Sequence, residues 1–184
     1  MLVLIAGPSG AGKDTLLNGA RAALAGARFR FVRRTITRAA VADGLEEHDV
    51  VTEQAFAALQ AAGAFALSWR AHGLHYGIPA DIAVDLAEGR VVVANVSRTV
   101  VAEAAARFPS QVIEITAPAD LLARRLSARG REDAAGVARR LARQTDLPLP
   151  APREAIVNDG TEAAGVRKLV DALRRIAAAQ DLPV

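Results

Sequence analysis

The sequence contains no cysteine, which excludes disulfide bonds, thiolate metal sites and a cysteine nucleophile. A chain without disulfides suits the reducing cytosol, so we expect a cytoplasmic protein. Aromatic residues make up only 4% of the chain, too few for the stacked rings that single-stranded nucleic acids require. No apolar run approaches the ~20 residues of a membrane span, and the apolar start at residues 1–6 lacks the basic flank of a signal peptide. These absences argue against nucleic acid and membrane as partners.

What the chain does contain is typical of one globular domain that handles phosphates. Its 184 residues suffice for a compact core, and 52% hydrophobic with 23% charged residues describe a folded rather than a disordered chain. The formal net charge is +3 and the sequence pI is about 10.1, because arginine is abundant. This charge balance suits phosphate-rich ligands. The oligomeric state stays open, a homodimer included.

The most specific motif is G-P-S-G-A-G-K at residues 7–13, directly after an apolar run at residues 2–6. A strand that breaks into a glycine loop and opens a helix is the phosphate-binding P-loop arrangement. Backbone N–H groups surround the phosphates, the lysine reaches the outer phosphates, and the helix N-terminus adds partial positive charge. We therefore expect a bound nucleoside triphosphate. The residues expected to bind it are Gly7, Pro8, Ser9, Gly10, Ala11, Gly12 and Lys13.

The residue after the lysine departs from the usual motif. Most P-loops have a serine or threonine there, whose hydroxyl binds Mg²⁺, but this sequence has Asp14 followed by Thr15. A carboxylate at that place would repel a triphosphate unless a cation lies between them, so we favour Asp14 as a ligand of Mg²⁺, directly or through water. The alternative leaves the ion to Thr15 and gives Asp14 only a favourable interaction with the helix N-terminus.

Apolar runs alternate with helical patterns along the chain, which predicts an α/β fold with a parallel sheet covered by helices on both faces. In such sheets ligands bind outside the carboxyl ends of the strands, where the glycine loop falls. The expected strands lie at residues 2–6, 29–35, 64–70, 90–96, 111–116 and 155–157. The expected helices lie at residues 15–25, 53–62, 79–89, 98–107, 118–129, 134–144 and 161–179. Loops are predicted at residues 38–48 and 71–77.

Arginines are concentrated in two of the predicted helices, 118–129 and 134–144, which a glycine turn joins. Arginines at 125, 129, 140 and 143 could converge on a transferring phosphoryl group, whose transition state spreads negative charge over several oxygens. A turn with few apolar anchors is also suited to closing over a substrate. An ordinary solvated pair of basic helices explains the same residues, and the pattern alone leaves both interpretations open.

A second polar cluster comes from residues 33–38, 46–48 and 69–77, which fall in predicted loops and at strand ends. Loop arginines, threonine hydroxyls and a tyrosine are the groups that a second, phosphorylated substrate needs. His72 and His75 lie three residues apart without a matching pair of ligands, so we do not favour a zinc site.

These motifs, in this order, resemble the guanylate kinase family over nearly the whole chain. The matching segments are G-P-S-G-A-G-K at 7–13, T-R at 37–38, G-x-x-Y-G at 73–77, R-L-x-x-R-G at 125–130, R-L at 140–141 and V-N-D at 157–159. The resemblance implies a guanylate kinase-like P-loop NTPase core with a parallel sheet. It also implies a single kinase domain over residues 1–184, with an acceptor-binding part near 34–80 and an arginine-rich lid near 125–145.

The same resemblance implies roles for single residues. Asn158 would lie near the adenine of ATP, while Arg38 and Tyr76 would hold the phosphate of the acceptor. The residues that would act on the transferring phosphate are Lys13, Arg129 and Arg140, with Arg131 and Arg143 as further candidates.

The departures from guanylate kinases lie in the part that reads the base. Leu67 stands where that family has a glutamate that pairs with guanine, and an unpaired donor in a buried site is costly. Val41, His48 and Ser97 replace an arginine, a tyrosine and an aspartate of the family. The phosphate-handling parts remain, so the pattern indicates an acceptor that carries phosphates but no base.

One branch of this group, the ribose 1,5-bisphosphate phosphokinases of bacterial phosphonate breakdown, is similar in these places. The similarity covers G-K-D at 12–14, the long segment 63–79, N-x-S-R at 95–98 and V-N-D-G at 157–160. It implies that ATP, with Mg²⁺, phosphorylates a small sugar phosphate, ribose 1,5-bisphosphate, to 5-phosphoribosyl 1-diphosphate. The acceptor-binding residues expected on this basis are Arg38, His48, Tyr76, Ser97 and Arg98.

Three other interpretations compete with a sugar-phosphate kinase. A guanylate kinase or another nucleoside monophosphate kinase is disfavoured by Leu67 and Ser97. A non-catalytic guanylate kinase-like binding module is disfavoured by the intact glycine loop and the lid arginines. A regulatory P-loop GTPase would show N-K-x-D and a strand that ends in D-x-x-G, and the sequence shows neither feature.

Overall fold

The computed structural model describes residues 1–26, 28–37, 48–128, 149 and 153–180. The helix predicted over 134–144 and nearly all of the loop predicted over 38–48 lie outside these residues. Within the described ranges, no helix is both long and apolar enough to cross a membrane.

Five parallel strands form the main sheet, in the order β2-β7-β1-β8-β9. All residues of β1 and β7 are buried, since both faces of the sheet are covered, and this is why continuous runs of Val, Leu and Ile mark the strands. The predicted parallel sheet is confirmed. Its strands are β1 (Leu2–Ala6), β2 (Phe29–Phe31), β7 (Val91–Asn95), β8 (Ser110–Thr116) and β9 (Arg153–Val157).

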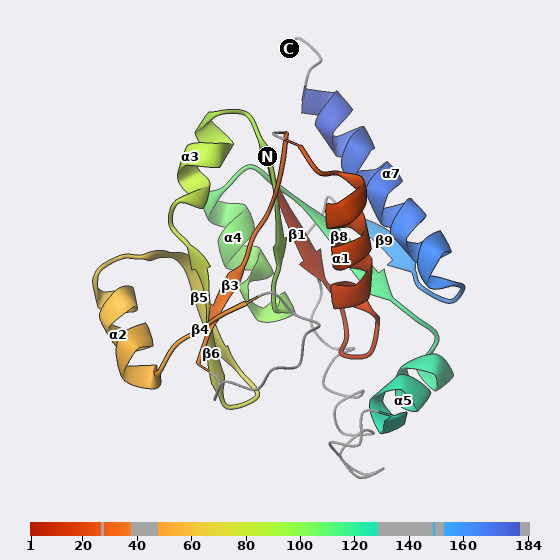
Figure 1. The fold of residues 1–184 in the computed structure, drawn as a ribbon, viewed down its shortest axis with the longest axis horizontal. Coiled ribbons are helices and arrows are strands. Elements are labelled where there is room, and N and C mark those ends of the chain that lie inside the picture. The colour runs from red at the N-terminus through yellow and green to blue at the C-terminus, as the bar shows by residue number, and fades with distance from the viewer. Residues whose placement is uncertain (27, 38–47, 129–148, 150–152, 181–184) are drawn as a thin grey trace.

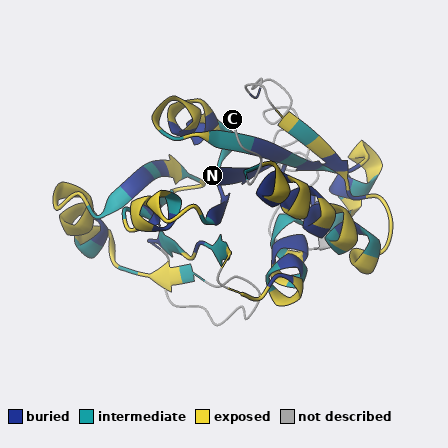
Figure 2. Ribbon diagram, turned by 90° about the horizontal axis from the view of Figure 1, so that it is seen from above, coloured by how far each residue is buried: buried dark blue, intermediate teal, exposed yellow. Residues whose placement is uncertain are grey.

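Two long helices cover one face of the main sheet (Figure 1). α1 (Lys13–Ala23) and α7 (Glu162–Gln180) pack on each other and on the side chains of Val3 and Ile5. The apolar stripe of each helix supplies this core, including Leu16 of α1, while the opposite stripe is exposed, as the colours of Figure 2 show.

Shorter helices cover the other face of the main sheet, to which Leu2 and Leu4 point. These are α3 (Ile82–Ala87), the 3-10 turn η1 (Arg98–Val100) and α4 (Val101–Arg107). A further helix, α5 (Ala119–Ala128), follows β8 and lies near the glycine loop (Figure 1), and its Leu122 joins the core formed by α1 and α7.

A smaller sheet of four strands, in the order β4-β3-β6-β5, lies with α2 beside the main sheet (Figure 1). β3 is parallel to β4 and antiparallel to β6, and β6 pairs with β5 as an antiparallel hairpin. Thr52 caps α2, because its Oγ1 accepts the N–H of Ala55 at 3.1 Å. The elements of this part are β3 (Arg34–Ile36), β4 (His48–Val50), α2 (Glu53–Ala61), β5 (Phe65–Ala71) and β6 (Leu74–Pro79).

The strand predicted over 29–35 is wrong, because this stretch serves both sheets. The chain leaves the main sheet after Phe31 and enters the smaller sheet at Arg34. Val32 is buried between the two, and Arg33 forms an exposed ion pair with Asp49 at 2.9 Å. A run of β-forming residues does not indicate where a strand changes partners.

The loop predicted over 71–77 and the helix start predicted at Pro79 are also wrong. His72 and Gly73 form a two-residue turn with φ of 52° and 76°, and β6 follows at once. Pro79 ends β6 opposite Phe65, where a strand end does not need the N–H that proline lacks. The helix starts three residues later than predicted, at Ile82.

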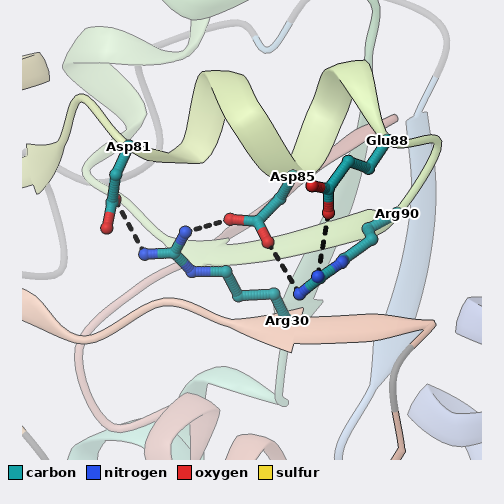
Figure 3. A network of polar contacts seen from close by, with 5 residues as sticks. All are labelled: Arg30, Asp81, Asp85, Glu88 and Arg90. Atoms are coloured by element: carbon teal, nitrogen blue, oxygen red, sulfur yellow. Dashed lines mark hydrogen bonds and ion pairs between the residues drawn. The ribbon is translucent and has the colours of Figure 1, made fainter.

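A network of charged side chains joins α3 to the amino ends of β2 and β7 (Figure 3). The side chain of Asp85 is only 8% exposed, accepts a hydrogen bond from Arg30 and forms an ion pair with Arg90 at 2.9 Å. Arg30 also pairs with Asp81, and Arg90 with Glu88, both at 2.8 Å. Partial burial alone lowers the pKa of Arg30, but the hydrogen bonds to the two aspartates outweigh it, so this pKa lies above its ordinary value. The network therefore fixes α3 through fully charged pairs.

Candidate active site

The glycine loop joins β1 to α1 at the carboxyl edge of the main sheet, as predicted. Gly7 has a φ of 142°, and a Cβ there would lie 1.9 Å from the carbonyl oxygen of Ile115. Gly12 has a φ of 85°, and a Cβ there would lie 2.6 Å from Nδ2 of Asn158. Both positions exclude a side chain, so the loop lies close against β8 and β9. The first turn of α1 follows directly, and its N–H groups and helix dipole favour an anion.

Lys13 heads α1 and folds back over the loop. Its Nζ donates hydrogen bonds to the carbonyl oxygens of Gly7 at 2.8 Å and Pro8 at 2.9 Å. The ammonium group therefore lies against the backbone of the loop, which is the place where the motif predicts the outer phosphates.

Asn158, directly after β9, lies beneath the loop. Its side chain is buried, and Nδ2 donates to the carbonyl oxygen of Ala11 at 2.8 Å. Its backbone N–H donates to Thr116 at 2.8 Å, which continues the pairing of β8 with β9. Asn158 therefore holds the shape of the loop, a role that the sequence did not indicate. Its contact with adenine stays a prediction.

Asp14 lies in the first turn of α1, and its Oδ1 accepts a hydrogen bond from Nδ2 of Asn95 at 2.7 Å. Asn95 is the last residue of β7 and is only 9% exposed. In the described part of the chain, no lysine or arginine forms an ion pair with Asp14. Thr15 is exposed beside it. Sequence reasoning noted the N-x-S-R segment but missed the contact of Asn95 with Asp14, because residues 81 positions apart give no local signal.

These side chains suit Mg²⁺ held together with a nucleotide rather than a cage made only of protein. Among the described residues, no group of three or more His, Cys, Asp or Glu could hold a metal ion. Mg²⁺ is usually bound by one or two carboxylates together with substrate phosphates and water. One carboxylate, Asp14, beside the phosphate loop fits that donor set.

α5 contacts the glycine loop from the side opposite the smaller sheet (Figure 1). A Cβ at Gly10 would lie 3.2 Å from Cγ of Leu126 and 3.3 Å from the carbonyl oxygen of Leu122. Arg125 donates through Nη1 to the carbonyl oxygen of Gly10 at 3.4 Å. The first arginine of the predicted lid is thus at the loop. The other arginines assigned to the phosphates lie outside the described residues, namely Arg129, Arg131, Arg140 and Arg143.

Tyr76, predicted to bind the acceptor, lies on β6 in a stack of three side chains. Its ring is parallel to that of Trp69, with centroids 5.3 Å apart and 5° between planes. The guanidinium carbon of Arg34 lies 5.6 Å from the centroid of the tyrosine ring. These contacts fix the ring of Tyr76 on the smaller sheet.

The other predicted acceptor residues of the smaller sheet are placed only in part. His48 is half-buried on β4, opposite Arg34 in the register. Arg38 lies outside the described residues, but Thr37 before it is buried and exchanges hydrogen bonds with the backbone of His75 at 2.8 and 3.1 Å. Leu67 is 1% exposed and belongs to the apolar core under the sheet.

Ser97 and Arg98 follow β7 at the carboxyl edge, where η1 packs against β5 of the smaller sheet. The hydroxyl of Ser97 caps η1 and accepts the hydroxyl hydrogen of Thr99 at 2.9 Å. Arg98 pairs with Glu114 of β8 at 2.5 Å, and the second carboxylate oxygen of Glu114 lies 3.5 Å from Arg153. The predicted acceptor residues of η1 therefore lie where the two sheets meet, and their contact with substrate stays a prediction.

Comparison with known proteins gives close relatives of two names, both of which include a ribose 1,5-bisphosphate kinase. The chain is 52% identical over 176 residues to ribose 1,5-bisphosphate phosphokinase PhnN of Methylobacterium radiotolerans, covering 94% of this chain and 97% of that protein. It is 50% identical over 172 residues to the bifunctional ribose 1,5-bisphosphokinase-thymidine phosphorylase of Cupriavidus necator, covering 92% of this chain. The chain spans only 28% of the length of that bifunctional relative. No family model matches the chain.

Among solved structures, the chain is similar to the guanylate kinase of Anaplasma phagocytophilum. The TM-score is 0.70 at 19% sequence identity, and the match covers 99% of this chain and 87% of that one. At this identity the likeness concerns the fold, and it confirms the predicted guanylate kinase-like P-loop architecture.

Proposed function

The chain belongs to the ribose 1,5-bisphosphate phosphokinase family, and we propose that it transfers the γ-phosphoryl group of ATP to ribose 1,5-bisphosphate. The products are ADP and 5-phosphoribosyl 1-diphosphate. The observation that carries the proposal is the 52% identity to a protein of that name along nearly the full length of both chains. The role in phosphonate breakdown and the cytoplasmic location stay predictions from the sequence.

In this proposal residues 1–184 act as one kinase domain that binds two substrates at the carboxyl edge of the main sheet. The glycine loop binds the phosphates of ATP. Residues 34–80 bind the acceptor, and the arginines of residues 125–145 act on the phosphates between them. The contact of η1 with β5 supports this arrangement, because it joins the edge of the main sheet to the smaller sheet.

Lys13 binds the outer phosphates of ATP. Its ammonium group already lies against the loop, on the carbonyl oxygens of Gly7 and Pro8, so a short movement exchanges these neutral acceptors for charged phosphate oxygens. The exchange is favourable because hydrogen bonds to a charged acceptor are stronger than those to a neutral one.

Asp14 and Thr15 are the residues that would hold Mg²⁺ beside these phosphates. Among the described residues, the side-chain hydrogen bond of Asp14 comes from the neutral amide of Asn95. When bound, the ion neutralises negative charge on the phosphate oxygens during transfer.

The acceptor residues lie on both sides of the junction of the sheets. Tyr76 and His48 belong to the smaller sheet, and Ser97 and Arg98 follow β7. Arg38 follows Thr37, whose place at β6 is fixed by His75. A site of arginines and hydroxyl groups suits phosphates, and the buried Leu67 supplies no polar group that could read a base.

The reaction needs no general base, because the nucleophile is an oxygen of the 1-phosphate of the acceptor, which is already ionised. That oxygen forms a bond to the γ-phosphorus while the bond from this phosphorus to the oxygen of the β-phosphate breaks. ADP takes the electron pair of the broken bond. Catalysis then consists of positioning and of charge stabilisation by Lys13, Arg129 and Arg140.

The proposal is tested by acceptor choice. The protein is incubated with ATP and Mg²⁺ and with either ribose 1,5-bisphosphate or GMP, and ADP release is measured together with the phosphorylated product. We expect kcat/KM for ribose 1,5-bisphosphate to exceed that for GMP by about a hundredfold or more. Comparable values for both acceptors would contradict the proposal, and a preference for GMP would assign the chain to the nucleoside monophosphate kinases.

A further inference from the structure

Asn95 and Asp14 form a hydrogen-bonded pair between the end of β7 and the first turn of α1. Nδ2 of Asn95 lies 2.7 Å from Oδ1 of Asp14. A carboxylate only accepts hydrogen bonds, so the amide nitrogen, and not the amide oxygen, must face it. Asn95 is 9% exposed, and a buried amide needs such a partner. The bond therefore fixes the orientation of both side chains.

The strand register explains why these two residues meet. Asn95 of β7 is the parallel partner of Ile5 of β1, and the glycine loop begins two residues later, at Gly7. The loop turns the chain back into α1, and Asp14 is the second residue of that helix. The hydrogen bond thus links the end of β7 to the first turn of α1, the helix that follows the glycine loop.

The neutrality of Asn95 separates this pair from the other acids at the main sheet. Asp85 and Glu114 each form ion pairs with two arginines, which offset their charge. Asp14 accepts from an amide, which orients the carboxylate without removing its negative charge. An acid held in this way is fixed in place and still available to a cation.

The pair also reverses the usual distribution of groups in P-loop proteins. There a hydroxyl residue follows the lysine, and an aspartate from a strand on the other side of the site completes the binding of Mg²⁺. Here the carboxylate follows the lysine as Asp14, and the strand next to β1 ends in the uncharged Asn95.

We propose that Asn95 is a positioning residue for the metal: its amide holds the Asp14 carboxylate so that the second oxygen faces the cation bound with ATP. The inference rests on the proposed use of ATP and Mg²⁺, but it does not depend on the identity of the acceptor. Asn95 acts only through Asp14 and does not touch the substrate.

The test is a double-mutant cycle on metal affinity, measured without an acceptor. Mn²⁺ replaces Mg²⁺ as a paramagnetic probe, and its binding to the protein with a non-hydrolysable ATP analogue is followed by electron paramagnetic resonance. We expect Asn95→Ala to weaken Mn²⁺ binding about tenfold, which is the lower end of the loss in metal affinity when a residue hydrogen-bonded to a metal ligand is removed. Asp14→Ala should weaken Mn²⁺ binding more. In the Asp14→Ala background, Asn95→Ala should then change nothing further.

Two outcomes would overturn the proposal. Mn²⁺ affinity that is unchanged in Asn95→Ala would show that the bond does not orient the ligand. Losses that add in the double variant would show that Asn95 acts independently of Asp14. If Asn95→Ala does not fold, Asn95→Leu keeps the branching and the number of side-chain heavy atoms without the donor, and the same cycle applies to it.

The matched control is Asp171→Asn, which removes one exposed carboxylate of α7 and should leave Mn²⁺ affinity unchanged. Because no acceptor is present, the cycle separates this inference from the proposed function. If the Mn²⁺ affinities follow the expected cycle but the enzyme does not phosphorylate ribose 1,5-bisphosphate, only the proposed acceptor is contradicted. If the enzyme phosphorylates ribose 1,5-bisphosphate but the Mn²⁺ affinities do not follow the cycle, only the role of Asn95 is contradicted.

Discussion

Two clusters of charge lie at opposite edges of the main sheet, and they differ in what holds each charge. At the amino edge, Asp85 is paired with Arg30 and Arg90, so acids and bases neutralise one another within the protein. At the carboxyl edge, Asp14 is held by the amide of Asn95, and Lys13 donates to backbone carbonyl groups. The first arrangement fixes a helix. The second places Asp14 and Lys13 beside the glycine loop, where the motif predicts a ligand.

The comparison predicts that substitutions at the two edges have opposite signatures. Changes at the amino edge should lower the free energy of unfolding and leave catalysis per folded molecule intact. Changes at the carboxyl edge should lower catalysis and leave the fold intact.

The largest effect is expected for Lys13→Ala. Phosphoryl transfer should fall at least about a thousandfold, because the main point charge on the outer phosphates is removed. The melting temperature without nucleotide should change little, since the hydrogen bonds of the ammonium group to Gly7 and Pro8 go to carbonyl oxygens that water can solvate. Lys168→Ala is the matched control, because Lys168 is the only other lysine and its side chain is 50% exposed on α7. Unfolding of Lys13→Ala would break the comparison.

Asp85→Ala should show the opposite signature. Removing a buried partner of two arginines should lower the free energy of unfolding by about 3 kcal/mol. This is the low end of the usual cost of breaking a buried ion pair, because Arg30 is still paired with Asp81 and Arg90 with Glu88. For a chain of this length that corresponds to a melting temperature about 6–12 °C lower. The kcat, measured well below the transition, should be unchanged. A lower kcat with an unchanged melting temperature would contradict the assignment.

Arg140→Ala and Arg129→Ala extend the comparison to residues outside the described ranges. Each should lower kcat about a hundredfold, because cations beside the phosphates act mainly on the charge of the transition state. Steady-state kinetics with varied ATP would separate this effect from binding. A higher KM for ATP with an unchanged kcat would remove these arginines from the catalytic group.

The smallest effect is expected for Arg107→Ala. Arg107 pairs with Glu103 at 3.0 Å on the outer surface of α4, and about half of each side chain is exposed. Such a pair contributes roughly 0.3–0.5 kcal/mol, which thermal unfolding in low and high salt would resolve. A loss as large as that of Asp85→Ala would show that burial is not what makes the amino-edge network important.

The sequence predicts the parts of the fold that local patterns determine. Continuous apolar runs indicate the buried strands of the main sheet, and the glycine pattern locates the loop and the helix after it. The smaller sheet is less predictable, because β3 and β4 have only three residues each and carry polar side chains. The chain passes from the main sheet to the smaller sheet near Val32, and this change depends on tertiary contacts rather than on the local sequence. Proline is compatible with both a strand end and a helix start, so Pro79 does not distinguish them.

In the candidate site too, residues within one short segment can be predicted from the sequence, whereas contacts between distant residues cannot. Lys13 and the loop glycines are visible in the sequence because one short segment contains them. Asn95 and Asn158 act through hydrogen bonds to residues 81 and 147 positions away, and their importance appears only when the strands align. Arg98 was predicted for the acceptor, but its pairing with Glu114 depends on the register of two strands.

The hydrogen bond from Asn158 to Ala11 has a consequence for how the protein is made. The glycine loop is synthesised before Asn158, whose side chain holds the shape of the loop and follows Ala11 by 147 residues. A nascent chain that has reached only β8 carries the complete loop sequence but lacks this brace. Contacts between such distant residues form late, because the loop that they close is long. Nucleotide affinity should therefore emerge on the ribosome only after β9 has docked, and it would serve as a marker of finished folding.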